Sequence, residues 1–349
     1  MRRVNIAIIG AGGNIARRHA YGYLRVPEKA KIAVVVDVNK AAAKRRKAMW
    51  DAESWSSDYT DALRRENVEA VDICLPHHLH AEVAIAALEA GKHVLVEKPM
   101  ATTLRDADRI IRAAKKSGLT FMVAESARFV PAHQHVKELL DRKALGRISL
   151  ARTLQGGPGC LKKMLDPKSW KGTADRGGGG ALIDSGIHRL DLYRWFLGEV
   201  DYVYAWMEQQ EKKLKKKCED NALVLLKFRN GAVGELITSW TIRNPWNEIL
   251  EIYGNKGTAI VDILSSQPLA VFSPKLRKEG WFYPLIEHSG GWPGWLLDSI
   301  AREVEHFVDC IRRDKEPLVK GEDGRAALEI ALAAYSSAQT GRPERLPLR

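Results

Sequence analysis

The first 125 residues alternate short apolar runs with stretches of helical periodicity. The apolar runs are rich in β-branched residues and span 4–9, 32–36, 70–75, 93–96 and 120–123. The stretches between them carry apolar residues at helical spacing and span 14–24, 40–50, 80–90 and 104–116. Strands that alternate with helices form a parallel sheet covered on both faces, and right-handed crossovers make that sheet doubly wound. The sequence therefore predicts a Rossmann α/β domain over residues 1–125.

The pattern changes after about residue 125. Strand-like runs now follow one another at 222–228, 232–240, 248–253 and 258–263. Turn signals at Asn230-Gly231 and at 254–257 separate neighbouring runs, which favours antiparallel pairing. Helical patterns span 133–142, 181–197, 295–313 and 323–338. We predict an α+β domain over residues 126–349 with a large, mostly antiparallel sheet, which binds substrate and mediates oligomerisation, and whose last helices pack back toward the N-terminal domain.

Composition narrows the class of protein. Apolar residues make up 45% of the chain and charged residues 28%, with no uninterrupted apolar stretch of membrane-spanning length, which favours a soluble globular protein. The start Met1-Arg2-Arg3 is typical of a signal peptide, but the apolar run after it is short and leads into glycines, which indicates a buried strand. The cysteines are far apart with no C-x-x-C spacing, which argues against disulfides and a zinc ribbon. They are Cys74, Cys160, Cys218 and Cys310. We therefore expect a cytoplasmic protein.

The net charge of +12 requires an explanation, because basic proteins often bind nucleic acids or anionic membranes. Its densest source is a run of lysines. They are Lys212, Lys213, Lys215, Lys216 and Lys217. The run has no interleaved aromatic residues and is followed by Glu219 and Asp220, which is typical of a solvated loop or a protected strand edge. We therefore expect no nucleic-acid or membrane partner.

A glycine-rich segment follows the first predicted strand and opens the first predicted helix. It reads Gly10-Ala11-Gly12-Gly13-Asn14-Ile15-Ala16. In this context, backbone N–H groups and the helix N-terminus bind a dinucleotide pyrophosphate. The third small residue, Ala16, arrives one position later than the G-x-G-x-x-G/A pattern requires. The candidate cofactor-binding residues here are Gly10, Gly12, Gly13, Asn14 and Ile15.

Asp37 ends the second predicted strand, where a carboxylate can accept hydrogen bonds from the ribose 2′-hydroxyl. This position favours NAD over NADP. The alternative is a helix-capping role for Asp37 beside Asn39. NADP also stays open, because nearby basic side chains can neutralise a 2′-phosphate. They are Lys40, Arg45 and Arg46.

Three segments together resemble one protein family. The run from Gly91 to Pro99 ends in Glu97-Lys98-Pro99 and resembles the E-K-P signature of the glucose–fructose oxidoreductase, inositol dehydrogenase and MocA family. Residues 75–80 are similar to the family's Pro-x-x-x-H segment, with His77 where Asn is commoner. Residues 177–191 resemble its G-G-G-x-L-x-D-x-G-x-H-x-x-D signature, and 341–348 resemble its C-terminus. The resemblance spans nearly the whole chain and implies a Rossmann fold, a nicotinamide cofactor and a site between the domains.

The resemblance also implies catalytic roles. Lys98 matches the family's catalytic lysine, His188 its catalytic histidine, and Asp184 the carboxylate paired with them. The spacing of Asp184, His188 and Asp191 is i, i+4 and i+7, so on one helix they share a face. The alternative for an isolated D-x-x-x-H pattern is a core histidine whose ring nitrogens are hydrogen-bonded within the protein. Asp191 lies further along the helix, and the simpler interpretation is that it anchors Arg194 or a backbone group.

Further site residues follow from the resemblance. The implied cofactor contacts beyond the glycine segment are Asp37, Pro76, His77, His80, Glu97, Lys98, Trp170 and Lys171. Lys171 stands where the family has Arg, which weakens the case for a bidentate contact. The implied substrate contacts are Lys98, Arg128, Asp184 and His188. A structural ion pair is the alternative for Arg128.

Two other groups of side chains have a composition that ligand sites can share. His77, His78 and His80 lie close in sequence, but no Asp, Glu or Cys cluster accompanies them, so we expect no metal. Three tryptophans flank a Gly/Pro-rich loop. Their rings can stack on a sugar, but tryptophan more commonly packs in a core or at a subunit interface. They are Trp281, Trp292 and Trp295.

The chemistry follows from the residue types. Oxidation of a secondary alcohol needs a base for the hydroxyl proton while hydride leaves for the nicotinamide, and Lys98 and His188 can divide that task. The sequence predicts an NAD(P)-dependent oxidoreductase acting on a CH–OH group of a small polyhydroxylated substrate: a sugar, a sugar derivative or a cyclitol. The alternatives are an NAD-retaining glycoside hydrolase or lyase that uses transient oxidation, and a non-catalytic sugar or NAD sensor. We also expect self-association to a dimer or tetramer, because the second sheet needs cover on its free face.

Overall fold

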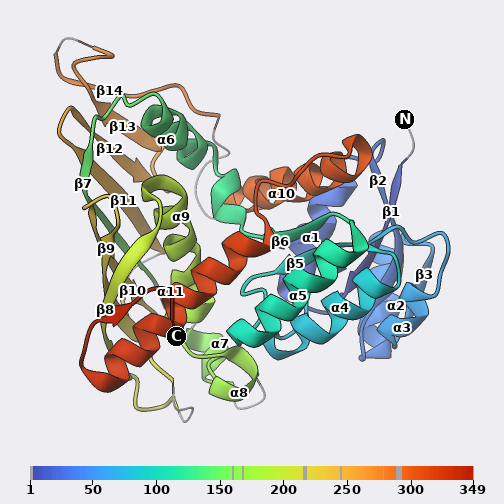
Figure 1. Ribbon diagram of the computed structural model, residues 1–349. Coiled ribbons are helices and arrows are strands. Elements are labelled where there is room, and N and C mark those ends of the chain that lie inside the picture. The colour runs from blue at the N-terminus through green and yellow to red at the C-terminus, as the bar shows by residue number, and fades with distance from the viewer. Residues whose placement is uncertain are drawn as a thin grey trace. The chain divides into compact units, whose positions relative to one another are not determined.

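The computed structural model describes residues 3–158, 161–166, 169–214, 218–243, 246–277, 279–287 and 293–348. The chain divides into two compact units (Figure 1). The first unit contains Met1–Ser126 and Leu297–Arg325, and the second contains Ala127–Leu296 and Ala326–Arg349. Residues 297–325 therefore cluster with the first unit, whereas the sequence predicts them as part of the second domain, in helices that pack back toward the first.

The first unit is built on a six-stranded sheet of order β3-β2-β1-β4-β5-β6, in which every neighbouring pair is parallel. The strands are β1 (Val4–Ile9), β2 (Ala30–Val36), β3 (Ser54–Ser56), β4 (Ala70–Ile73), β5 (His93–Glu97) and β6 (Phe121–Ala124). The helices between them are α1 (Asn14–Leu24), α2 (Lys40–Met49), α3 (Tyr59–Leu63), α4 (His80–Glu89) and α5 (Leu104–Ser117). The strand order reverses beside β1, which is where doubly wound sheets bind their ligands. The predicted Rossmann fold is confirmed.

Local sequence signals explain where these helices begin and end. The Asn39 side chain accepts a hydrogen bond from Ala42 N at the start of α2, and Thr103 caps α5 by accepting from Asp106 N. Gly118 ends α5 at a φ of +67°, a left-handed conformation that favours glycine. The predicted helices 14–24 and 104–116 therefore match α1 and α5 within one residue. The short strand β3 and the five-residue helix α3 were missed, because neither is long enough to show a period.

The helix α10 (Gly294–Arg313) covers part of the first unit through its residues from 297 onward (Figure 1). It packs closely on α1: a Cβ atom added at Gly22 would lie 2.4 Å from Val304 Cγ2 and 3.0 Å from Ala301 Cα. Glycine at position 22 therefore permits this close helix–helix contact. The contact also brings Glu303 of α10 into the interior of the unit, where it is fully buried.

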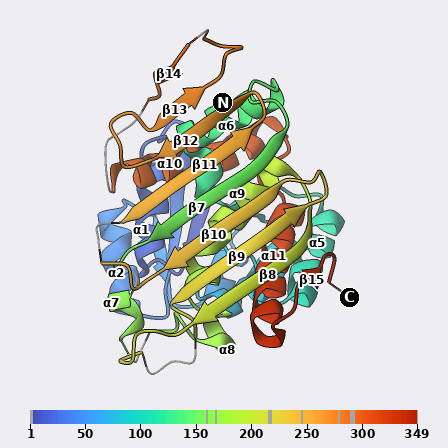
Figure 2. The same ribbon diagram turned by 90° about the vertical axis from the view of Figure 1, so that its left-hand side faces the viewer.

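The second unit is built on a nine-stranded sheet of order β14-β13-β12-β11-β7-β10-β9-β8-β15, seen face-on in Figure 2. The strands are β7 (Ile148–Gly156), β8 (Val200–Glu208), β9 (Asn221–Phe228), β10 (Val233–Ser239), β11 (Asn247–Gly254), β12 (Gly257–Asp262), β13 (Leu269–Phe272), β14 (Trp281–Phe282) and β15 (Glu344–Arg345). Every neighbouring pair is antiparallel except β7 with β10. The predicted large, mostly antiparallel sheet is confirmed.

Helices lie on one face of this sheet (Figure 2). They are α6 (Pro131–Asp141), α9 (Ile187–Leu197) and α11 (Gly321–Thr340). Both α6 and α9 contact strands of the sheet, and Ser337 Oγ of α11 accepts a hydrogen bond from Ala205 N of β8. Two short helices, α7 (Leu161–Met164) and α8 (Ala174–Gly177), precede the glycine-rich signature. The opposite face of the sheet carries exposed apolar side chains such as Leu150, Trp206 and Leu225.

Several sequence predictions concern the surface and the thiols. Cys74, Cys218 and Cys310 are free thiols, whereas Cys160 lies outside the described residues. Lys212 and Lys213 occupy an exposed turn after β8, and 215–217 lie outside the described residues, as do Met1, Arg2 and Trp292. In the described parts of the chain, no helix is long and apolar enough to cross a membrane.

Candidate functional site

The glycine segment forms a tight turn between β1 and α1. Gly10 has a φ of +88°, and a Cβ atom there would lie 2.4 Å from Cys74 O, so only glycine fits. Gly10 N donates to Val36 O, and Gly13 N donates to Gly10 O. Gly13 is the N-cap residue of α1, and no side chain caps the helix start. The first turn of α1 therefore keeps backbone donors that suit an anionic pyrophosphate.

Asp37 fixes this turn from the end of β2. Its Oδ2 atom accepts a hydrogen bond from Gly12 N at 2.7 Å, and Oδ1 accepts from Asn39 N at 2.8 Å. Asn39, and not Asp37, supplies the side-chain cap of α2. Asp37 is half-buried, so its carboxylate lies beside the pyrophosphate turn and still reaches the surface.

The basic residues that kept NADP open differ in their accessibility. Lys40 and Arg45 are exposed on α2. Arg46 is buried, stacks over the Trp50 ring at 5.4 Å, and donates from Nε to Ala11 O at 3.2 Å. Burial, together with the neighbouring Arg17 and Arg45, lowers the pKa of Arg46. Arg46 therefore supports the backbone of the glycine turn.

Lys98 directly follows β5, at the carboxyl end of the parallel sheet. Its side chain is half-exposed, whereas the neighbouring Glu97 is buried. Glu97 Oε2 accepts a hydrogen bond from Lys98 N at 3.1 Å, and Glu97 Oε1 lies 3.0 Å from His19 Nε2. The backbone that carries Lys98 is therefore tied to the interior of the first unit through Glu97.

The histidines near β4 differ in their surroundings. His80 is fully buried, with its ring nitrogens 2.8 Å from Pro99 O and 2.9 Å from Leu75 O. It thus joins the segment after β4 to the segment after β5, and burial lowers its pKa. His77 is also buried, Pro76 is half-buried and His78 is exposed. The cofactor contacts implied for His77 and His80 remain predictions, and the positions above give His80 a structural role.

The second-unit signature begins with glycines at close approaches. Gly179 has a φ of +147°, and a Cβ atom at Gly180 would lie 1.8 Å from Glu219 O. The buried carboxylate of Glu219 accepts hydrogen bonds from Gly180 N at 3.0 Å, Leu182 N at 2.9 Å and the Tyr335 hydroxyl at 2.8 Å. Burial raises the pKa of Glu219. The sequence does not predict this clamp, because no spacing rule connects Glu219 with a loop 39 residues earlier.

Asp184 lies in a π-helical turn, Leu182–Gly186, immediately before α9. Turns of this kind recur at functional sites, because the wider ring displaces side chains from the regular helical face. Asp184 is buried and forms an ion pair with Lys171, which also lies 5.4 Å from the Trp170 ring centre. His188 follows in the first turn of α9 and is half-buried. The predicted continuous helix over 181–197 is therefore a π turn followed by α9.

Comparison with known proteins explains why both signatures occur in one chain. Residues 4–125 match an oxidoreductase family with an NAD-binding Rossmann fold, and residues 137–346 match the C-terminal alpha/beta domain of that oxidoreductase family. The chain belongs to the Gfo/Idh/MocA family. The resemblance found in the sequence is confirmed, and the first unit is an NAD-binding Rossmann domain.

Relatives of known activity cover nearly the whole chain. Myo-inositol 2-dehydrogenase of Thermotoga maritima is 27% identical, with 98% of each chain covered. A 4-carboxy-2-hydroxymuconate-6-semialdehyde dehydrogenase of Sphingobium is 35% identical, over 90% of this chain and 92% of its own. Levoglucosan dehydrogenase, solved with NADH and levoglucosan, superposes with a TM-score of 0.90 at 26% identity, covering 99% of this chain and 100% of that chain.

Within this Gfo/Idh/MocA chain, Arg128 occupies a buried ion pair. Its Nε and Nη2 atoms donate to the two Asp191 carboxylate oxygens at 2.7 and 2.6 Å, and the two side chains are at most 3% exposed. Arg194 pairs with Glu199 instead. This geometry favours the structural alternative for Arg128, and it identifies Arg128 as the residue that Asp191 anchors.

Lys171 and the tryptophans are placed as follows. Lys171, implied as a cofactor contact, forms an ion pair with Asp184 of the glycine-rich signature. Trp281 is exposed on β14, and Trp295 is buried in α10. Trp295 therefore serves packing, and Trp170 is half-buried beside Lys171.

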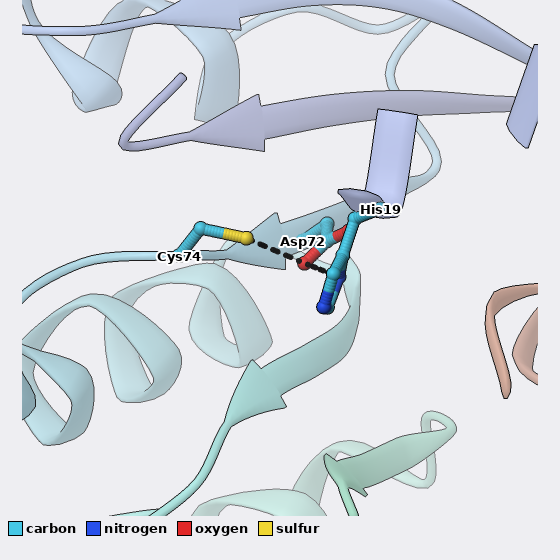
Figure 3. Close-up of side chains that lie close together, drawn as sticks. All are labelled: His19, Asp72 and Cys74. Atoms are coloured by element: carbon cyan, nitrogen blue, oxygen red, sulfur yellow. Dashed lines mark hydrogen bonds and ion pairs between the residues drawn. The ribbon is translucent and has the colours of Figure 1, made fainter. Parts of the chain in front are cut away.

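One side-chain group has the composition of a metal site. Of the described His, Cys, Asp and Glu residues, only His19, Asp72 and Cys74 bring three ligand atoms within 4.8 Å of one another (Figure 3). All three are buried in the first unit. The histidines at 77, 78 and 80, weighed in the sequence, do not form such a group among the described residues.

Proposed function

We propose that the protein is an NAD-dependent dehydrogenase that transfers hydride between nicotinamide and a secondary alcohol of a small polyhydroxylated compound. The observation that carries this proposal is the coexistence of the two signatures. Lys98 follows the carboxyl end of β5 in the NAD-binding domain, and Asp184 with His188 follows a glycine turn clamped by Glu219. A non-catalytic protein, such as a sugar or NAD sensor, does not require both signatures.

The proposed chemistry divides between three side chains. Lys98 and His188 relay the hydroxyl proton of the substrate, and Asp184 orients the histidine or binds a second hydroxyl. Lys171 forms an ion pair with Asp184 and balances the charge of that carboxylate. The bound nicotinamide accepts the hydride.

The cofactor proposal rests on Asp37. Its carboxylate lies beside Gly12 N at the end of β2, where it accepts hydrogen bonds from a ribose hydroxyl and repels a 2′-phosphate. The proposed pyrophosphate contacts are the backbone atoms of Gly12, Gly13, Asn14 and Ile15, with Gly10 shaping the turn. NAD is therefore the proposed cofactor, and NADP is the weaker one.

Two substrate classes have support from relatives. The inositol and levoglucosan dehydrogenases favour a cyclitol or an anhydrosugar. The semialdehyde dehydrogenase is 35% identical, which favours a carboxylated semialdehyde as a second candidate. The net charge of +12 fits an anionic substrate as well as it fits the cofactor.

Self-association is part of the proposal. The free face of the nine-stranded sheet carries apolar side chains with exposed fractions of 52% for Trp206, 45% for Val233 and 37% for Leu150. A second copy of the same sheet supplies the matching apolar cover, which makes a two-fold dimer the simplest assembly. We also infer a cytoplasmic location, because the described cysteines are free thiols.

The experiment is a turnover screen of the purified protein with NAD and with NADP. The panel contains myo-inositol, scyllo-inositol, levoglucosan, common aldoses and 4-carboxy-2-hydroxymuconate-6-semialdehyde, with absorbance at the reduced nicotinamide band as the readout. Net NADH formation on at least one compound is expected. Substrate consumption without net NADH would instead support the lyase or hydrolase alternative, and tight sugar binding without any turnover would support a sensor.

A further inference from the structure

A buried histidine of the first unit lies between two carboxylates. His19 projects from α1 toward the sheet, where Asp72 of β4 and Cys74 converge on it (Figure 3). Its Nδ1 atom is 2.9 and 3.1 Å from the two Asp72 oxygens, and its Nε2 atom is 3.0 Å from Glu97 Oε1. Ionised carboxylates only accept hydrogen bonds, so both ring nitrogens must carry protons. With two ionised carboxylates as partners, this geometry fits an imidazolium at His19.

The other groups around His19 are consistent with this charge. Burial is the largest single influence and lowers the pKa of His19, but the charge of Asp72, its hydrogen bond to the ring and the Cys74 side chain together raise that pKa well above its usual value. Burial also raises the pKa of the Cys74 thiol, which lies 3.4 Å from Asp72 Oδ1 and stays protonated. Burial likewise raises the pKa of the Tyr23 hydroxyl.

A further carboxyl group faces the cluster from α10. Glu303 is fully buried, and neither of its oxygens has a hydrogen-bond partner among the described residues. Burial, together with the charges of Glu97, Glu125 and Asp72, raises the pKa of Glu303, against the opposing effect of His19. Burial and these charges therefore favour the neutral form of Glu303, whereas Asp72 and Glu97 are the carboxyl groups that contact the His19 ring.

One of those partners connects the cluster with Lys98. Glu97 uses Oε1 to accept from His19 and Oε2 to accept from Lys98 N. We propose that His19 is a positioning residue for Lys98: the doubly protonated ring fixes the Glu97 carboxylate, which in turn fixes the backbone that carries the lysine. This inference rests on the proposed role of Lys98 in proton transfer.

Two isosteric variants separate positioning from stability. The amide nitrogen of His19→Gln occupies the place of Nε2 and reaches Glu97, whereas that of His19→Asn occupies the place of Nδ1 and reaches only Asp72. Both remove the ring charge, so both should lower the thermal midpoint. Only His19→Asn should lower kcat strongly, by about 10- to 100-fold, with the Kd for NADH within about threefold of the wild type. His135→Asn, on α6 of the second unit, is the matched control.

The kinetic test uses the panel compound that the wild-type enzyme oxidises fastest, and it repeats the variants in a Lys98→Met background. If His19 acts through Lys98, His19→Asn should lower kcat less than about threefold once Lys98 is absent. Equal losses for the Gln and Asn variants, or a full loss that persists without Lys98, would overturn the inference. Unchanged turnover in Lys98→Met alone would remove Lys98 from proton transfer, and with it the role of His19.

A second measurement needs no turnover. In protein labelled with 15N-histidine at pH 8, His19 should show two protonated ring nitrogens, and the signals should vanish in both His19 variants. A neutral ring, or a zinc ion bound at Nδ1 and detected by elemental analysis, overturns the inference even where Lys98→Met is impaired. That outcome leaves the proposed role of Lys98 intact.

Discussion

The two units hold their proposed site residues in different ways. In the first unit, Gly10, Asp37 and Lys98 lie at or just beyond the carboxyl ends of β1, β2 and β5, so the parallel sheet itself brings them to one edge. In the second unit, Asp184 and His188 lie on a π turn and α9, and Glu219 and Tyr335, far away in sequence, hold the glycine turn that precedes them. The first arrangement follows from topology alone, whereas the second depends on individual long-range contacts.

Lys98→Met tests the first arrangement where its expected effect is largest. The change keeps the apolar stem and deletes the titratable amine. General acid–base groups contribute about 10²- to 10⁴-fold, so kcat should fall by that factor while the Kd for NAD stays within roughly tenfold. Steady-state kinetics and NAD titration measure the two quantities. Lys116→Met, on the exposed face of α5, is the control. Turnover within about threefold of the wild type would remove Lys98 from proton transfer.

Arg128→Met tests the second arrangement. It leaves Asp191 buried without its bidentate partner, and breaking a buried ion pair typically lowers the free energy of unfolding by about 3–5 kcal/mol. Denaturant unfolding measures this loss. Arg194→Met breaks the more exposed pair with Glu199 and should cost about 1 kcal/mol or less. A stable Arg128→Met protein with a raised substrate KM would restore Arg128 as a substrate contact.

The sequence predicted more of the first unit than of the second. Buried parallel strands read as apolar runs, so β1, β2, β4, β5 and β6 were each recognised within about two residues. The strands β7 and β8 were missed. In β7, Arg152 on the free face of the sheet and the polar Thr153 and Gln155 on its buried face obscure the simple alternation. Pairing of β7 with β10 in parallel joins segments about 80 residues apart, which no local pattern reports.

The candidate site divides in the same way. Signature residues such as Lys98 and His188 were identified from the sequence, because the family resemblance marks them. The residues that support these signatures were not identified from the sequence. His19, Glu219 and Tyr335 act through partners 37 to 155 residues away, and only folded geometry brings such pairs together.

Glu219→Gln sharpens the comparison with a smaller expected effect. Glutamine offers one acceptor oxygen where the carboxylate accepts from Gly180 N, Leu182 N and Tyr335, so at least one buried donor loses its partner. Such a loss costs about 1–3 kcal/mol. We expect kcat to fall about tenfold as Asp184 shifts, with NAD affinity unchanged. Glu208→Gln, exposed at the end of β8, is the control. Equal kinetics for the two variants would show that the signature turn does not need its clamp.

Asp37→Ser has the smallest expected effect. It tests whether the side chain at the end of β2 in the first unit sets the preference for NAD over NADP. Serine removes the charge that repels a 2′-phosphate but can still donate to it, so the ratio of kcat/KM for NADP to that for NAD should rise about tenfold, close to 1.4 kcal/mol. Part of the change must come from poorer use of NAD, because Asp37 Oδ2 also accepts from Gly12 N at 2.7 Å and the glycine turn loses that support.

Asp37→Asn separates these contributions: it keeps the acceptor for Gly12 and removes only the charge. If Asp37→Asn raises kcat/KM for NADP as much as Asp37→Ser does and leaves kcat/KM for NAD unchanged, charge repulsion decides the cofactor preference. If the unmodified protein binds NAD and NADP equally well, Lys40 and Arg45, two exposed cations of α2, set the cofactor choice instead.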